Sequence, residues 1–222
     1  MIRVALPGRG PVSALLTEAP DPFTLLVLAH GAGAGMHHPF MQAIAESLAQ
    51  RGVSVLRYQF PFMEAGSKRP DSPAVAHLAV GAAVATAAGL AGTLPLFAGG
   101  KSFGGRMSSQ AQALEPLPGV RGLVFFGFPL HPAGRPSVER AEHLSSVRVP
   151  MLFVHGSRDT LADGGLLEAV ATRLGPLATL HTIPGADHSF HVPARSGRTD
   201  FQILQDIADR VTAWMRVICG SG

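Results

Sequence analysis

Short apolar runs alternate with helical patterns along almost all of the 222-residue sequence. Several runs are apolar at nearly every position, as expected of parallel strands that are covered on both faces. Strand–helix alternation of this kind is typical of an α/β fold. We therefore predict a mostly parallel central sheet of about eight strands with helices on both faces. The candidate strands are Ile2–Leu6, Val12–Thr17, Thr24–Ala29, Val53–Tyr58, Leu94–Ala98, Gly122–Phe126, Met151–His155 and Thr179–Ile183.

Two helices have clear boundary signals. Pro39 suits the first turn of a helix that Gly52 ends. The last helix opens on the segment Thr199–Gln202, which has the capping-box pattern in which a threonine is followed three residues later by a glutamine. Both helices carry one apolar face, as helices that pack on a sheet do.

The chain is predicted to form a single domain over residues 1–222. Two segments rich in proline, glycine and charge, Phe62–Pro73 and Pro129–Pro136, read as loops, and the strand–helix alternation resumes after each. Only residues 128–149 separate the sixth and seventh candidate strands. This segment is too short for a separate lid domain, so we expect little or no cap.

Composition excludes several functional classes. Hydrophobic residues make up 46% and charged residues 15%, which argues against disorder. The net charge is only +3 and its cations are scattered, so no concentrated basic face for nucleic acid is expected. The single cysteine, Cys219, excludes an intramolecular disulfide and fits a cytoplasmic protein. The sequence does not decide between a homodimer and a monomer.

An uncharged stretch between Asp71 and Lys101 is long enough to cross a bilayer. Residues 74–92 are mostly alanine and glycine, however, and Pro95 separates them from a short apolar run. The stretch is better explained as a buried helix followed by a buried strand. The N-terminus lacks the long apolar segment of a secretory signal. We therefore expect no membrane partner.

The strand that ends this stretch leads into a glycine-rich turn with one serine. Gly100-x-Ser102-x-Gly104 matches the nucleophile elbow, in which a serine stands at a sharp turn between a strand and a helix. A helix is predicted over Arg106–Leu114. The amide of Phe103 and the helix N-terminus would then stabilise an oxyanion.

A nucleophilic serine needs a base, and the base needs an orienting acid. In this architecture the acid and then the histidine follow the serine along the chain, at the ends of later strands. Asp159 and His188 occupy these positions. Asp163 on the same loop is the alternative acid, and His191 is the alternative base.

The loop after the third strand should supply the second oxyanion donor. The Ala32 amide is the first choice and the Gly33 amide the second, because small residues let the backbone approach a substrate. The candidate substrate-binding residues are Gly33, Met36, His37, Phe62 and Pro129.

On these motifs the sequence resembles the α/β-hydrolase superfamily, in its small dienelactone-hydrolase-like group. More narrowly, it is similar to the branch that contains the testis-expressed and NSL-complex-subunit proteins and their bacterial relatives. The resemblance implies a serine hydrolase with Ser102, Asp159 and His188 as its triad. Dienelactone hydrolases use a cysteine nucleophile, whereas Cys219 lies in the last helix, so lactone opening does not carry over. The matching segments are Ala29–Gly35, Gly100–Arg106, Phe128–Pro132, Glu142–Leu144, Phe153–Asp159 and Asp187–Phe190.

The predicted function is therefore hydrolysis of a small ester or related acyl substrate, without a cofactor. The alternative is a non-catalytic protein-interaction module that retains the same fold. A phosphate-binding P-loop is excluded because Pro95 stands where that motif requires a glycine. No metal site is expected, because the adjacent His37 and His38 lack partners at ligand spacing.

Overall fold

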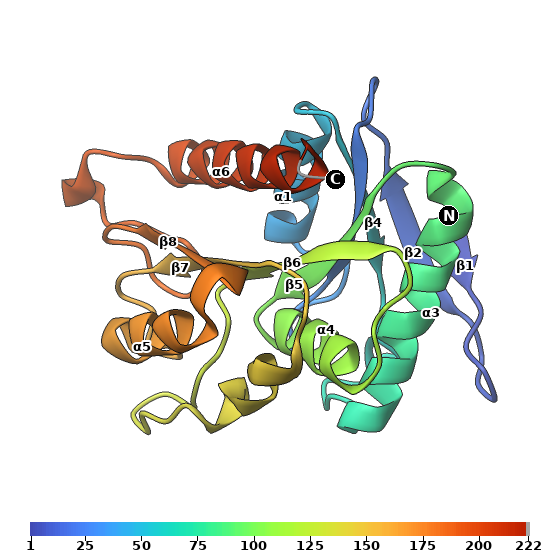
Figure 1. Ribbon diagram of the computed structural model, residues 1–222, viewed down its shortest axis with the longest axis horizontal. Coiled ribbons are helices and arrows are strands. Elements are labelled where there is room, and N and C mark those ends of the chain that lie inside the picture. Colours follow the sequence, from blue (N-terminus) through green and yellow to red (C-terminus); the bar gives the residue numbers. More distant parts are fainter. Residues whose placement is uncertain (221–222) are drawn as a thin grey trace.

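The computed structural model describes residues 1–220, which form one eight-stranded sheet with helices on both faces (Figure 1). The strand order is β1-β2-β4-β3-β5-β6-β7-β8. Strand β2 runs antiparallel to both of its neighbours, and every other pair is parallel. The predicted α/β fold is confirmed. The strands are β1 (Ile2–Val4), β2 (Val12–Thr17), β3 (Thr24–Ala29), β4 (Val53–Tyr58), β5 (Leu96–Lys101), β6 (Val120–Phe126), β7 (Met151–Gly156) and β8 (Ala178–Ile183).

The helices form two layers. Helices α1 (Pro39–Ala49) and α6 (Asp200–Gly220) pack together on one face of the sheet. Helices α3 (Pro73–Ala91), α4 (Phe103–Leu114) and α5 (Gly164–Leu174) cover the other face (Figure 1). The short helices are α2 (Pro61–Glu64), η1 (Glu139–Ser146), η2 (Gly175–Leu177) and η3 (Ala194–Ser196).

Strand β3 shows how continuously apolar runs fill both layers. Leu25, Val27 and Ala29 belong to the core cluster beneath α3 and α4, whereas Leu26 and Leu28 belong to the cluster beneath α1 and α6. Successive side chains of a strand point to opposite faces, so an apolar residue is needed at every position. Because β3 to β8 run parallel, their carboxyl ends lie along one edge of the sheet.

The uncharged stretch forms a helix followed by a strand, as predicted. By length and composition α3 is apolar enough to cross a membrane, a test that the core helix of a soluble protein also passes. Its face of Ala76, Ala79, Val80 and Ala83 is buried, and the helix packs against α4, β3 and β5. Helix α3 thus belongs to the layer of helices that covers this face of the sheet.

Several sequence-based boundaries were wrong. Strand β1 ends at Val4 and not at Leu6, β6 begins at Val120 and not at Gly122, and β7 and β8 are each one residue longer than predicted. Strand β5 is not Leu94–Ala98, because its two glycines continue the ladder with β6 up to Lys101. Helix α4 begins at Phe103, directly after Ser102, and not at Arg106. The segment Phe62–Pro73 starts inside α2. Between β6 and β7 the chain forms only η1, which packs against α4, and no cap is seen among the residues that the structure describes.

Candidate active site

Ser102 stands in a strained backbone conformation between β5 and α4. Its φ is +51°, and Phe190 (φ +64°) is the other non-glycine residue with positive φ within residues 1–220. Such a conformation costs of the order of 1–3 kcal/mol and persists only where the surroundings enforce it. The Ser102 amide donates to the Phe126 carbonyl at 3.1 Å, and its carbonyl accepts from the Arg106 amide at 3.1 Å. The turn thus fixes the serine between the sheet and the first turn of α4.

The glycines around Ser102 are sterically required. A Cβ on Gly104 would lie 2.5 Å from the Ala29 carbonyl oxygen and 2.6 Å from that of His30. A Cβ on Gly100 would also collide with the Ala29 carbonyl oxygen. Helix α4 therefore starts in direct backbone contact with the end of β3.

This contact predicts the effect of one added methyl group. Gly104→Ala should lower the free energy of unfolding by about 1–3 kcal/mol, because both contacts are to backbone that cannot move aside. The matched control is Gly89→Ala in α3, where nothing lies within 4 Å of the new Cβ. That variant should be more stable than wild type by about 0.5–1 kcal/mol. Urea unfolding measures both, and equal stability of the two variants would contradict the packing described.

Three predicted residues lie in one line of hydrogen bonds. The Ser102 Oγ lies 2.9 Å from His188 Nε2. On the other side of the ring, His188 Nδ1 lies 2.7 Å from Asp159 Oδ2. The His188 side chain is 23% exposed and that of Asp159 is 0% exposed. The line therefore runs from a buried carboxylate to a serine at the surface of a hollow.

Asp159 is held in one orientation and stays charged. Its Oδ1 accepts from the Leu161 amide at 2.8 Å, which leaves Oδ2 for the imidazole. Burial opposes the charged form, but the bonds from His188 and from the Leu161 amide outweigh it. Together they hold the pKa of Asp159 below its usual range. A charged carboxylate at this place favours a proton on His188 Nδ1.

The two alternative residues lie elsewhere. Asp163 is the N-cap of α5 and accepts from the Leu166 amide at 3.0 Å. His191 is exposed, and its Nδ1 lies 2.8 Å from Asp200 Oδ2. The structure therefore brings Asp159 and His188, and neither alternative, to Ser102.

The hollow beside Ser102 has a volume of about 360 Å³. Of the predicted site residues, it contains Ser102, His188, Ala32 and Gly33. Phe103 follows Ser102 as the first residue of α4, and the first amides of a helix have no partner within the helix. The side chains that sequence reasoning missed are His38, Phe40, Met41, Lys101 and Ser189.

Four predicted substrate-binding residues do not line this hollow. Met36 is buried, and its backbone is held by Gln59, which accepts from its amide, and by Arg57, which donates to its carbonyl. His37 is exposed.

The other two are buried away from the hollow. Phe62 packs into an aromatic group with His30, Phe60 and Phe103, where only 4% of its surface is exposed. Pro129 is buried after β6 and does not reach the hollow. Tertiary contacts, which the loop sequence does not reveal, turn these side chains away.

His30 supports the loop that holds Ala32. Its Nδ1 lies 2.8 Å from the Gly31 carbonyl oxygen, and its Nε2 accepts from the Phe60 amide at 3.0 Å. Burial lowers the pKa of His30 to about 4, so its ring is neutral at pH 7 and carries its proton on Nδ1. His155 differs, because neither of its ring nitrogens has a hydrogen-bond partner within residues 1–220.

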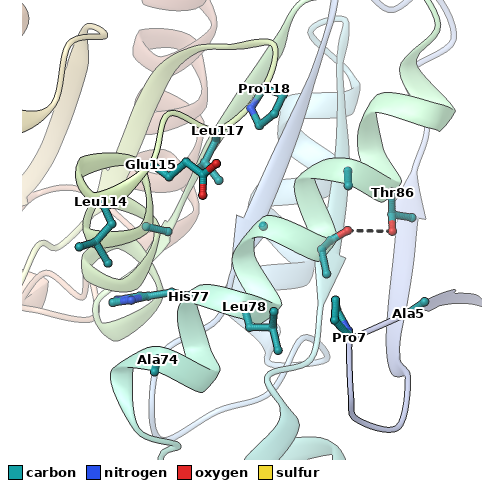
Figure 2. A pocket seen from close by; sticks show the side chains of 14 residues that line it. Ala5, Pro7, Ala74, His77, Leu78, Thr86, Leu114, Glu115, Leu117 and Pro118 are labelled. Carbon is teal, nitrogen blue, oxygen red and sulfur yellow. Dashed lines mark hydrogen bonds between the residues drawn. The ribbon is translucent and has the colours of Figure 1, made fainter.

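A larger hollow of about 810 Å³ lies between α3, the end of α4 and the segment after β1 (Figure 2). Its walls are mostly alanine, leucine and proline, with His77 and Glu115 as titratable groups. Figure 2 shows Thr86 turned back onto its own helix, where its hydroxyl donates to the Ala82 carbonyl at 2.9 Å. None of the described residues lining it is a serine or a cysteine, so the reactive groups gather at the smaller hollow.

A metal centre finds no support in the part of the chain that the structure describes. No group of three or more histidine, cysteine, aspartate or glutamate side chains is placed there to hold an ion. The chemistry available at the hollow is that of the serine, the imidazole and the carboxylate.

Solved structures share this fold over nearly their whole length. A dienelactone hydrolase from Anabaena variabilis is 20% identical with a TM-score of 0.75, covering 97% of this chain and 95% of that one. An α/β serine hydrolase homologue from Coxiella burnetii is 18% identical with a TM-score of 0.77, covering 94% and 95%. A serine hydrolase without a lid from Xanthomonas campestris is 21% identical with a TM-score of 0.73, covering 96% and 94%. At these identities the likeness concerns the fold.

A curated relative is much longer than this chain. The Mycobacterium tuberculosis H37Rv protein named "Putative phosphoribosyl transferase" is 29% identical over 221 residues, which cover 97% of this chain and 46% of that protein. The chain thus spans less than half the length of this relative, whose name describes the whole protein. Residues 22–216 match the family model described as an alpha/beta hydrolase domain. With this match over most of its length and with the fold of dienelactone-hydrolase-like proteins, the chain belongs to the α/β-hydrolase domain family.

Proposed function

We propose that this protein is a serine hydrolase that cleaves a small ester or related acyl substrate. The observation that carries the proposal is the line of hydrogen bonds from Asp159 through His188 to Ser102, with the serine on a strained turn before a helix. Nucleophile, base and orienting group in this order form a catalytic triad, which several unrelated folds use for acyl transfer. The Phe103 and Ala32 amides are the proposed oxyanion donors.

The reaction begins with attack of the Ser102 Oγ on the carbonyl carbon. His188 Nε2 takes the hydroxyl proton, and the carbonyl π-electrons move to oxygen. The Phe103 and Ala32 amides stabilise that oxyanion, because their dipoles are already aimed at it. When the tetrahedral intermediate collapses, the bond to the leaving alcohol breaks and His188 returns the proton to the alcohol oxygen. An acyl-serine remains.

Water completes the cycle by the same steps. His188 Nε2 takes a proton from the water as its oxygen attacks the acyl carbon, and a second tetrahedral oxyanion forms. On collapse the bond to Ser102 Oγ breaks, His188 protonates the serine oxygen, and the free acid leaves. Asp159 holds the Nδ1–H tautomer and stabilises the imidazolium in both halves of the reaction.

The size of the site favours a small substrate. The hollow of about 360 Å³ lies at the lower end of the range of roughly 300–1,000 Å³ that ligand pockets occupy. No cap encloses it within residues 1–220. We therefore expect short acyl chains to be hydrolysed faster than long ones.

A serine-directed fluorophosphonate probe tests the proposal. The folded wild-type protein should be labelled at Ser102, as shown by mass spectrometry of the modified peptide. Unfolded protein should not react, because its serines lack an adjacent base. A panel of p-nitrophenyl esters of increasing acyl length should then show the largest kcat/KM for the shortest chains. A folded protein that takes up no probe and cleaves no ester would instead be a non-catalytic interaction module of the same fold.

A further inference from the structure

Lys101 connects the strand that leads to Ser102 with the loop that carries His188. It is the last residue of β5, directly before Ser102, and its side chain lines the same hollow as Ser102 and His188. Its Nζ donates to the carbonyl oxygen of His188 at 2.5 Å. The residue that precedes the nucleophile thus binds the backbone of the residue that serves as base.

The ammonium of Lys101 lies beside two aromatic rings. Nζ lies 5.2 Å from the ring centroid of Phe190 and 5.9 Å from that of Phe40. The two rings stack on each other with centroids 5.6 Å apart. Gly127 also lies beside Nζ, since a Cβ there would be 3.0 Å from it, and its φ of +67° favours glycine at this position. A cation is attracted to aromatic faces, and this attraction grows when water is excluded.

The charge of Lys101 is not balanced by a close ion pair. No carboxylate among residues 1–220 forms a salt bridge with it, although Asp159 and Asp187 attract it from a distance. Asp187 accepts hydrogen bonds from the Ser189 and His191 amides instead. Lys101 is partly buried, and its hydrogen-bond partner is the His188 carbonyl.

We propose that Lys101 is a positioning residue of the hydrolytic site, whose charged ammonium ties the His188 loop to the strand that carries Ser102. The strained backbone of Phe190, with φ +64°, lies in the same loop, so the loop needs external contacts to keep this conformation. The effect on turnover rests on the proposed function, whereas the tether itself does not.

The tether should depend on pH. Burial lowers the pKa of Lys101 to about 8, against the opposing attraction of Asp159 and Asp187. Below this pH the ammonium is charged and the tether is intact. As pH rises through about 8, the neutral amine loses the attraction to both rings and most of its hydrogen-bond strength. Turnover should therefore fall on the alkaline side near that pH.

The variant Lys101→Met tests the tether because it keeps the length of the side chain but removes charge and donor. We expect kcat to fall by about 10²-fold with little change in KM, which is the order of effect that a misplacement of about 1 Å has on catalysis. The alkaline fall in kcat should also disappear. The matched control is Lys68→Met, which changes the protein's other lysine, exposed in the loop after α2. It should keep the wild-type kcat and pH profile.

A spectroscopic measurement tests the tether without any substrate. Protein labelled with ¹⁵N at the lysine side chains carries two labelled sites, one of which should titrate near pH 8 and be absent in Lys101→Met. The His188 Nδ1 proton signal should move over the same pH range in wild-type protein. It should also shift in Lys101→Met but not in Lys68→Met. The titration of wild-type protein tests the tether even where Lys101→Met fails to fold.

The outcomes separate the two proposals. A wild-type protein without probe labelling or ester hydrolysis refutes the hydrolase, while the His188 signal still reports on the tether. An active enzyme whose kcat, pH profile and His188 signal are unchanged in Lys101→Met refutes the tether alone.

Discussion

Replacing Ser102 with alanine should lower kcat for any ester that the wild-type enzyme cleaves by about 10⁴-fold or more. The substitution removes the only oxygen within hydrogen-bond distance of His188 Nε2 among the described residues. Without it, no acyl-enzyme can form, and only the oxyanion donors and substrate binding remain to accelerate attack by water. Steady-state hydrolysis of a short-chain p-nitrophenyl ester measures the loss.

The fold should survive this change. Ser102 contributes one side-chain hydrogen bond, so we expect the free energy of unfolding to change by about 1 kcal/mol or less. Ser145→Ala provides the matched control, because Ser145 is exposed in η1 and its hydroxyl donates to the Glu142 carbonyl, far along the chain from the hollow. This control should keep the wild-type rate and probe labelling. Wild-type activity in Ser102→Ala would show that another group is the nucleophile.

The fold could be predicted from the sequence because burial dictates composition at every strand position. The bounds of β3 and β4 were predicted as observed: β3 is apolar at every position after Thr24, and β4 begins directly after Gly52. The end of β5 was missed for a physical reason. Gly99 and Gly100 look like loop residues, yet they belong to the ladder with β6. Glycine is needed there because a Cβ on Gly99 would collide with the Val124 carbonyl oxygen of β6.

The positions of Ser102, Asp159 and His188 could be predicted because each follows a strand whose carboxyl end lies at the same edge of the sheet. The sequence favoured Asp159 as the acid but left Asp163 as the alternative. Both lie in the loop after β7, and only the structure shows that Asp163 caps α5.

The walls of the hollow were the least predictable part. Met36 and His37 lie in the sequence between Ala34 and His38, which line it, but the direction of a loop side chain depends on distant contacts such as those of Gln59 and Arg57. In the sequence, Lys101 suggests only the end of a P-loop, in Gly100-Lys101-Ser102. The interaction of its side chain with His188 spans 87 residues, and no local pattern reports a contact at that separation.

Replacing Asp159 with asparagine should lower kcat by about 10⁴-fold, although it changes one atom of the side chain. The reason is the hydrogen bond from the Leu161 amide, which sets the orientation of the side chain at position 159. This amide donates to Oδ1 at 2.8 Å, so the asparagine carbonyl will keep that place and its amide group will face His188 Nδ1. Nδ1 must then accept a hydrogen bond, which moves the ring proton to Nε2. A protonated Nε2 cannot take the proton of Ser102.

The pH dependence of stability should change in the same variant. The pKa of Asp159 is held below its usual range, so in wild-type protein it contributes stability that is present above its unfolded pKa and lost as pH falls through the folded one. Asparagine does not titrate. Asp159→Asn should therefore lose less stability on acidification than wild type does, which urea unfolding at several acidic pH values can measure.

Asp163→Asn is the matched control on the same loop. Asparagine caps a helix about as well as aspartate, so α5 should keep its N-cap bond to the Leu166 amide and kcat should stay close to wild type. A loss of activity in this variant, together with an active Asp159→Asn, would assign the acid to Asp163. Asp159→Ala separates tautomer from charge, because alanine removes the carboxylate without donating to Nδ1. If the wrong tautomer is the main cause, Asp159→Asn should be at least as slow as Asp159→Ala.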